Sequence, residues 1–175
     1  MSSVKKGLSK VEVGLRWDPS PIGAPEHDLD LVAVTYAADA AYDDPAYVVH
    51  FDSRSPDGTI ILNRDSRTGQ GFGYDEIMTL EFDRLAETYT RVVVGVVIQQ
   101  NEERKTFGDI GNTGVRIAEG YTELATSDLA EAAGSTAATL AEFTRDETGA
   151  WEFRSTVRGF DADPASFATQ LGTLS

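Results

Sequence analysis

Apolar and polar residues alternate with a period of two through much of the chain, which is the spacing of a half-buried β-strand. In residues 10–17, KVEVGLRW, the valines, leucine and tryptophan share one face and the charged side chains take the other. Residues 29–37, LDLVAVTYA, are apolar on both faces and predict a strand in the middle of a core. Residues 91–99, RVVVGVVIQ, form the most apolar run and predict a second fully buried strand.

Other segments rich in β-branched and aromatic residues predict further strands at 46–53, 59–63, 77–82, 113–119, 137–144 and 151–157. The turn residues of RSPDG predict a hairpin between the first two of these segments, and RDETGA predicts one between the last two. One helix is expected near the end of the chain, with Asp163 as N-cap, Pro164 in the first turn and Gly172 as the stop.

Eight to ten short strands separated by turns predict an all-β fold, a mostly antiparallel β-sandwich with a minor C-terminal helix. The sequence shows no repeat of 20–50 residues by inspection and no low-complexity linker, so residues 1–175 are expected to form a single domain. A chain of this length buries about two-thirds of the surface that its unfolded form exposes, which is enough for one core.

The charge of the chain narrows the possible partners. Fifteen Lys and Arg residues stand against 29 Asp and Glu residues, giving a net charge of -14. Such a surface repels phosphate backbones, so nucleic-acid binding is not expected, whereas cations are attracted. The absence of cysteine excludes disulfides, thiolate nucleophiles and thiolate metal sites. The N-terminal residues carry no apolar signal region and no run of about 18 apolar residues occurs, so we expect a cytoplasmic protein without a membrane span.

The segment 65–76, DSRTGQGFGYDE, combines alternating glycines with acids at both ends. Asp28 and Asp30 lie two residues apart at a strand entrance, so their carboxylates project from one face, roughly 6–7 Å apart. Calcium takes six to eight oxygen ligands at about 2.3–2.6 Å, and glycines let a backbone curl its carbonyls inward. The pattern is consistent with a calcium site, and the alternative is a solvated acidic turn. Neither the EF-hand pattern nor the lysine of a phosphate loop is present.

Other candidate residues have simpler structural explanations. Trp17 is expected to anchor the core at a strand end, and Trp151 and Phe153 alternate as core residues. His27 adjoins the acids and is expected to be a surface histidine rather than a ligand. The sequence lacks a G-x-S-x-G nucleophile motif, so catalysis is not expected, although a metal-dependent hydrolase built on the same acids is a third possibility.

Several of these motifs together resemble the TerD-type family of tellurium-resistance and stress proteins. They are GLRWDPS, HDLDL, SPDG, the loop D-x-x-T-G-x-G-x-G-x-D-E, Arg104 with Phe107–Gly108, and WEFRSTVRGF. Their order and spacing extend from about residue 7 to residue 172. The resemblance implies a β-sandwich that binds calcium at paired sites and acts in the cytoplasm in stress or tellurite tolerance. Other proteins of the same stress pathway are the protein partners that it implies.

The resemblance also implies a set of calcium ligands. These are Asp28, Asp30, Asp65, Gln70, Asp75 and Glu76. The loop departs from the family pattern at Ser66, Gln70, Phe72 and Tyr74, which replace an amide and three acids. Phe72 has no ligand atom and a tyrosine phenol is an unusual calcium ligand, so at least one site is expected to be weaker than is usual in the family.

The expected function is therefore non-catalytic calcium binding in a stress response associated with tellurite resistance. The alternative is an acidic protein-interaction module in which calcium is incidental.

Overall fold

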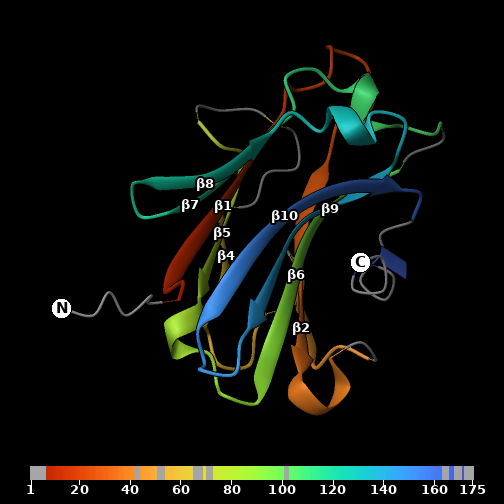
Figure 1. The fold of residues 1–175 in the computed structure, drawn as a ribbon. Coiled ribbons are helices and arrows are strands. Elements are labelled where there is room, and N and C mark those ends of the chain that lie inside the picture. The colour runs from red at the N-terminus through yellow and green to blue at the C-terminus, as the bar shows by residue number, and fades with distance from the viewer. Residues whose placement is uncertain are drawn as a thin grey trace.

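The computed structural model describes residues 7–41, 44–50, 54–64, 69, 73–100, 103–162, 166–167 and 171. Ten strands form two five-stranded sheets that pack face to face (Figure 1). All pairings between the described strands are antiparallel. The predicted all-β sandwich is confirmed. No helix in the described part of the chain is both long and apolar enough to cross a membrane.

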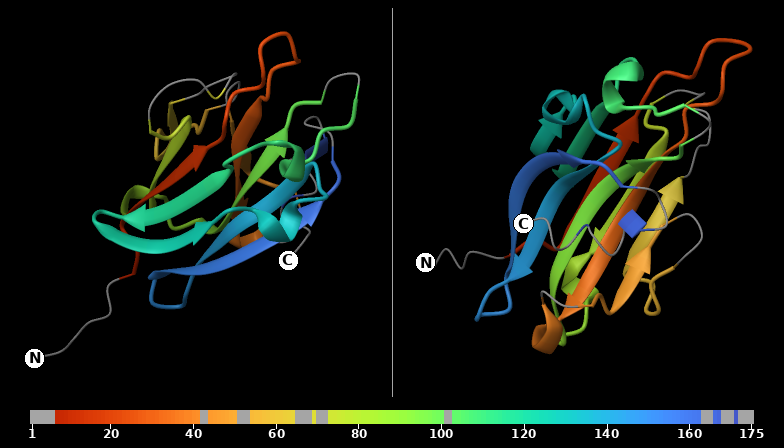
Figure 2. Two further views of the ribbon diagram at one scale, coloured as in Figure 1. Left: turned by 90° about the horizontal axis from the view of Figure 1, so that it is seen from above. Right: turned by 90° about the vertical axis from the view of Figure 1, so that its right-hand side faces the viewer.

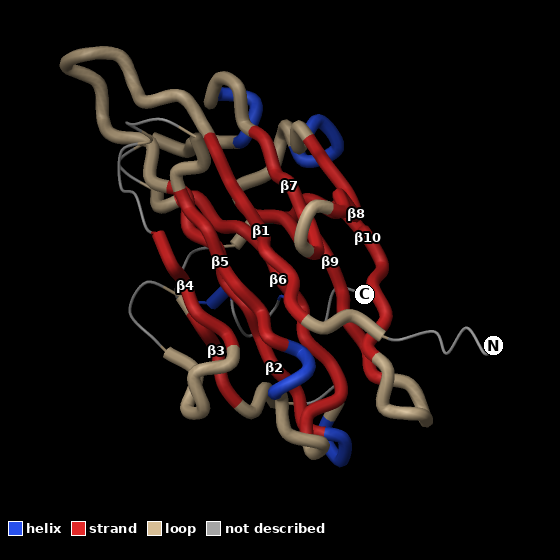
Figure 3. The backbone as a smooth tube through the Cα atoms, turned by 90° about the vertical axis from the view of Figure 1, so that its left-hand side faces the viewer, coloured by secondary structure: helices blue, strands red, loops and turns tan. Residues whose placement is uncertain are grey.

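The two sheets are called sheet A and sheet B. Figure 3 views the molecule from the side of sheet A. In spatial order, sheet A contains β4 (Ile60–Arg64), β5 (Glu76–Glu81), β1 (Lys10–Arg16), β7 (Gly114–Glu119) and β8 (Thr122–Ser127). Sheet B contains β10 (Trp151–Phe160), β9 (Ala137–Arg145), β6 (Tyr89–Ile98), β2 (Leu29–Ala37) and β3 (Tyr47–Val49).

The main core lies between the sheets and follows the alternation in the sequence. In β1, Val11, Val13 and Leu15 are fully buried, whereas Lys10 and Glu12 are exposed. A strand sends successive side chains to opposite faces, so burying one face of β1 leaves the other for polar residues. Trp17 is 3% exposed directly after the strand, which confirms its expected role as a core anchor.

Strands β2 and β6 are buried on both faces, as their continuous apolar runs predicted. Leu31 of β2 faces the core between the sheets, whereas Val32 belongs to a second cluster on the outer face of sheet B. Phe167 and Leu171, from the C-terminal segment, belong to this second cluster and are almost completely buried. The C-terminal segment therefore covers the centre of sheet B.

The helical elements that the structure delimits are four 3-10 turns: η1 (Ala38–Ala40), η2 (Phe82–Arg84), η3 (Phe107–Asp109) and η4 (Ala130–Ala132). The expected C-terminal helix is not among them. Of that segment, Ser166, Phe167 and Leu171 have helical geometry, and the residues between and around them, including Asp163, Pro164 and Gly172, lie outside the described residues. Two apolar side chains of this segment, Phe167 and Leu171, pack on the outer face of sheet B.

The prediction of a hairpin across RSPDG is wrong. The turn is present, but β3 pairs with β2 in sheet B, and β4 pairs with β5 in sheet A. The chain therefore crosses between the sheets at this turn. The hairpin between β9 and β10 is confirmed, with a register shift between Ser155 and Arg158. Strand β8 was not predicted, because as an edge strand it has no fully buried residue and thus no apolar stripe.

The long loop between β1 and β2 extends from one end of the sandwich (Figures 2 and 3). It runs from Trp17 to Asp28 and carries Ile22 fully exposed at its outer part. The same end carries η3 and η4 (Figure 1). This loop delivers Asp28 and Asp30 to the start of β2, so the candidate acids lie at this end.

The packing of the C-terminal segment on sheet B predicts how a substitution at Gly95 changes stability. A Cβ atom on Gly95 of β6 would lie 2.7 Å from the backbone oxygen of Ala138 and 2.6 Å from Leu171 Cδ1. We expect Gly95→Ala to lower the free energy of unfolding by about 1–3 kcal/mol, because the backbone and the C-terminal cover must both shift. Urea denaturation measures this change.

Gly134→Ala is the matched control, because a Cβ atom there meets nothing within 4 Å. Equal stability of the two variants would contradict the packing of the C-terminal segment on sheet B.

Candidate cation site

Three carboxylates converge at the start of β2. One carboxylate oxygen from each of Asp28, Asp30 and Glu76 lies within 4.8 Å of the others. Asp30 is 3% exposed and Glu76 is completely buried, whereas Asp28 is partly exposed. We call these three residues the acidic cluster. All three acids were expected together as ligands, and the structure brings Glu76 to the two aspartates from a strand of the other sheet.

Glu76 reaches the cluster from the first position of β5. It shares its face with Met78 and Leu80, so its side chain is directed between the sheets. Its Oε1 accepts a hydrogen bond of 2.9 Å from the backbone N–H of Leu31 on β2. This bond joins sheet A to sheet B through a buried carboxylate and brings that carboxylate beside the two aspartates.

Asp30 is held from the other side by β6, the neighbour of β2. Gln99 follows the last residue of β6, and its Nε2 donates a hydrogen bond of 2.6 Å to Asp30 Oδ2. The backbone N–H of Gln99 donates to the carbonyl oxygen of Asp28 at 2.8 Å. Both aspartates are therefore tied to the same residue, which the sequence did not single out.

Asp75 has a different set of contacts from its neighbour Glu76. Its Oδ2 accepts a hydrogen bond of 2.8 Å from the backbone N–H of Trp17, and its own N–H donates to the carbonyl of Leu15. Burial raises the pKa of the Asp75 carboxyl, and the bond from Trp17 and the charge of Arg64 oppose this only in part. Asp75 thus anchors the end of the glycine loop to the end of β1.

Trp17 also organises the two loops beside the cluster. Its indole Nε1 donates to the carbonyl of His27 at 2.8 Å, which fixes the end of the β1–β2 loop. Gly69 packs against the same indole with a φ of +75°, and a Cβ atom there would lie 2.5 Å from Nε1. A side chain at position 69 would therefore face both a left-handed backbone and a collision.

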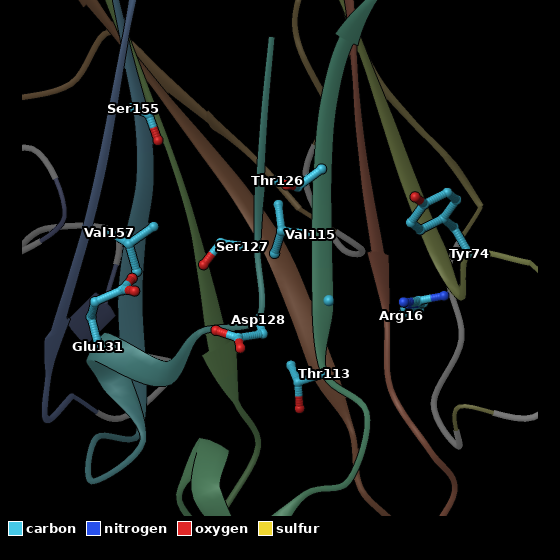
Figure 4. Close-up of a pocket in the computed structure, with 11 residues that line it drawn as sticks. Arg16, Tyr74, Thr113, Val115, Thr126, Ser127, Asp128, Glu131, Ser155 and Val157 are labelled. Carbon is cyan, nitrogen blue, oxygen red and sulfur yellow. The ribbon is translucent and has the colours of Figure 1, made fainter. Parts of the chain in front are cut away.

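Most of the glycine loop, including Asp65, Ser66, Gln70 and Phe72, lies outside the described residues, so its predicted ligands stay predictions. Tyr74 is described, and its ring covers Gly14, where a Cβ atom would lie 2.9 Å from the ring. Gly14 faces the outer side of sheet A. Tyr74 there lines a concavity of about 730 Å³ beside Arg16 (Figure 4). Tyr74, expected to be an unusual ligand, thus packs on the opposite face of sheet A from Glu76.

His27 is near the acids in sequence but does not belong to the acidic cluster. It lines a separate concavity with Lys105 and Asp109. Burial lowers the pKa of His27, the ammonium of Lys105 lowers it further, and Asp109 acts in the opposite direction. His27 is partly buried and not fully on the surface as expected, and its exclusion from the ligands stays a prediction.

The acidic cluster suits a hard cation. It offers carboxylate oxygens alone, the ligands of calcium and magnesium, and neither sulfur nor imidazole that would favour zinc or copper. The bonds from Leu31 and Gln99 come from neutral donors, which orient the carboxylates without cancelling their charge. The donor set therefore fits calcium.

A family model of the TerD domain matches residues 1–171 of this chain. The chain is 29% identical to the tellurium resistance protein TerD of an Alcaligenes species, over 98% of this chain and 92% of that protein. It is also 29% identical, with the same coverage, to general stress protein 16U of Bacillus subtilis (strain 168). The crystal structure of a homologue of telluride resistance protein (TerD) from Streptomyces coelicolor A3(2) is 60% identical. It superposes with a TM-score of 0.93 over 95% of this chain and 98% of that chain.

The environment of Asp75 leads to a prediction on pH. Because its pKa is raised in the folded protein, ionisation of Asp75 opposes folding, and this cost grows as the pH rises from about 3 towards 7. In calcium-free protein we expect Asp75→Asn to gain stability relative to the wild type as the pH rises. Denaturation in urea with a chelator, at a series of pH values, measures the difference.

Asp83→Asn, at an exposed position, is the control and should show no such trend. A stability difference for Asp75→Asn that falls with rising pH would contradict the assigned environment.

Proposed function

This chain belongs to the TerD family, and from that premise we propose that it is a non-catalytic calcium-binding protein of a cytoplasmic stress response associated with tellurite resistance. The names of its relatives support the stress and tellurium association. The acidic cluster is the observation that supports calcium binding.

The electrostatics of the acidic cluster favour a bound cation. Two ionised carboxylates 4.8 Å apart repel each other by about 3–4 kcal/mol at an effective dielectric constant of 20. Asp30 and Glu76 are buried, so water screens their repulsion poorly. A divalent cation between the carboxylates converts this repulsion into attraction. A site of this kind binds its ion only when folded, since Glu76 lies far along the chain from Asp28 and Asp30 and joins them only in the folded protein.

The proposed ligands divide into two groups. Asp28, Asp30 and Glu76 supply oxygens from the acidic cluster, and Asp65, Gln70 and Asp75 are proposed to complete the site from the glycine loop. Calcium would supply charge neutralisation there and would hold the loop against β2. The two aspartates belong to the start of β2 in sheet B, and Glu76 belongs to β5 in sheet A. An ion bound by all three would therefore reinforce the contact between the sheets.

The test is calorimetric titration of chelator-treated protein with calcium, together with thermal unfolding. At a calcium concentration one hundred times Kd we expect about 2.7 kcal/mol of added stability, or roughly 5–10 °C in Tm. Asp30→Asn and Glu76→Gln should each remove most of this gain, and the double variant should add little to either one, because both act on one ion. Each single variant should be at least as stable as the wild type without calcium, since one repelling charge is gone.

Asp83→Asn and Glu12→Gln change exposed acids by the same chemistry and should keep the full calcium effect. If the cluster variants also keep it, the ligand assignment is wrong. If the wild type shows no heat of binding and no shift in Tm at millimolar calcium, the proposed calcium function is wrong. A protein partner captured equally well with calcium and with chelator would then favour the acidic interaction module.

A further inference from the structure

Gln99 makes two hydrogen bonds to the acidic cluster. Its side-chain Nε2 lies 2.6 Å from Asp30 Oδ2, and its backbone N lies 2.8 Å from the carbonyl oxygen of Asp28. The residue stands directly after β6, whose last pair with β2 joins Ile98 to Leu29. The pairing of these two strands therefore places Gln99 opposite Asp28, within reach of Asp30.

We infer that Gln99 is a positioning residue for the cation site, an inference that rests on the proposed function. A carboxylate that accepts a bond at one oxygen loses its freedom to rotate, so the other oxygen is presented in a fixed direction. The backbone bond to Asp28 fixes the chain two residues earlier. The Gln99 side chain thus orients the Asp30 carboxylate, and its backbone N–H fixes the main chain at Asp28, before an ion arrives, which lowers the conformational entropy lost on binding.

The chemistry of the amide is suited to this role. The amide donates a hydrogen bond but carries no charge, so it orients Asp30 and leaves the negative potential of the cluster intact. An ammonium at the same place would orient Asp30 equally well but would offset the charge that attracts a divalent ion. Position 99 is therefore expected to control cation affinity separately from stability.

The next residue provides a matched control. The side chain of Gln100 makes two bonds to the backbone of Lys105, accepting from its N–H at 2.7 Å and donating to its carbonyl at 2.9 Å. Gln100 thus closes the loop after β6 by the same amide chemistry, and its bonds hold Lys105 instead of the aspartates. Loss of either glutamine side chain removes amide hydrogen bonds from the same end of the molecule.

The experiment compares Gln99→Met, Gln100→Met and Gln99→Lys in the full chain, with calcium affinity from calorimetry and Tm in chelator as separate readouts. We expect Gln99→Met to weaken calcium binding about tenfold, as is usual when a residue that orients a metal ligand is removed. Gln100→Met should lower Tm in chelator and keep calcium affinity within about twofold. Gln99→Lys retains a donor and so keeps or raises Tm in chelator, whereas its calcium affinity should fall by more than tenfold.

The outcomes separate the two proposals. If the wild type binds calcium and Asp30→Asn abolishes binding, but both Gln99 variants bind within twofold of the wild type, the role of Gln99 is overturned and the calcium function stands. If Gln99→Met and Gln100→Met weaken binding equally, Gln99 is a structural residue only, which also overturns the inference. If the wild type binds no calcium, the proposed function fails, and the inference fails with it.

Discussion

The hydrogen bond from Leu31 to the carboxylate of Glu76 is the contact on which the acidic end of the molecule depends. It links β5 of sheet A to β2 of sheet B through a completely buried acid. A buried carboxylate is costly unless it is hydrogen-bonded or its charge is offset. The bond from Leu31 offsets part of this cost for Glu76, but Asp28 and Asp30 add like charges beside it, so the acidic cluster carries a local electrostatic cost where the two sheets meet the long loop. A cation bound there would reduce that cost.

The rest of this end is arranged around Trp17. The indole fills the end of the core, contacts Gly69 and donates its Nε1–H to the carbonyl of His27, while the backbone N–H of Trp17 donates to Asp75. Trp17 thus holds Gly69, the end of the β1–β2 loop and the residue that precedes β5. Because His27 and Asp75 directly precede Asp28 and Glu76, Trp17 holds the backbone beside both of these acids.

Tyr74 and the acidic cluster lie on opposite faces of sheet A. The Tyr74 ring packs on Gly14 at the outer side of the sheet, so this residue, expected to be an unusual ligand, has a packing role. Glu76 and the two aspartates converge on the other face, where β2 and β5 hold them.

The sequence by itself determined the positions of most strands and the faces they bury. β1, β2 and β6 were predicted because the alternation of side chains is a local property of extended backbone. The placement of the Asp28 and Asp30 carboxylates on one face was likewise predicted from local backbone geometry. The expectation that Glu76 joins the aspartates came from the family resemblance, and the structure shows these acids together. The tertiary structure alone decided that β3 and β4 enter different sheets, that the edge strand β8 exists, and that Gln99 reaches Asp30. These features depend on hydrogen bonds between segments far apart in the chain, and the period of a strand reports which residues share a face but not which other strand that face will meet.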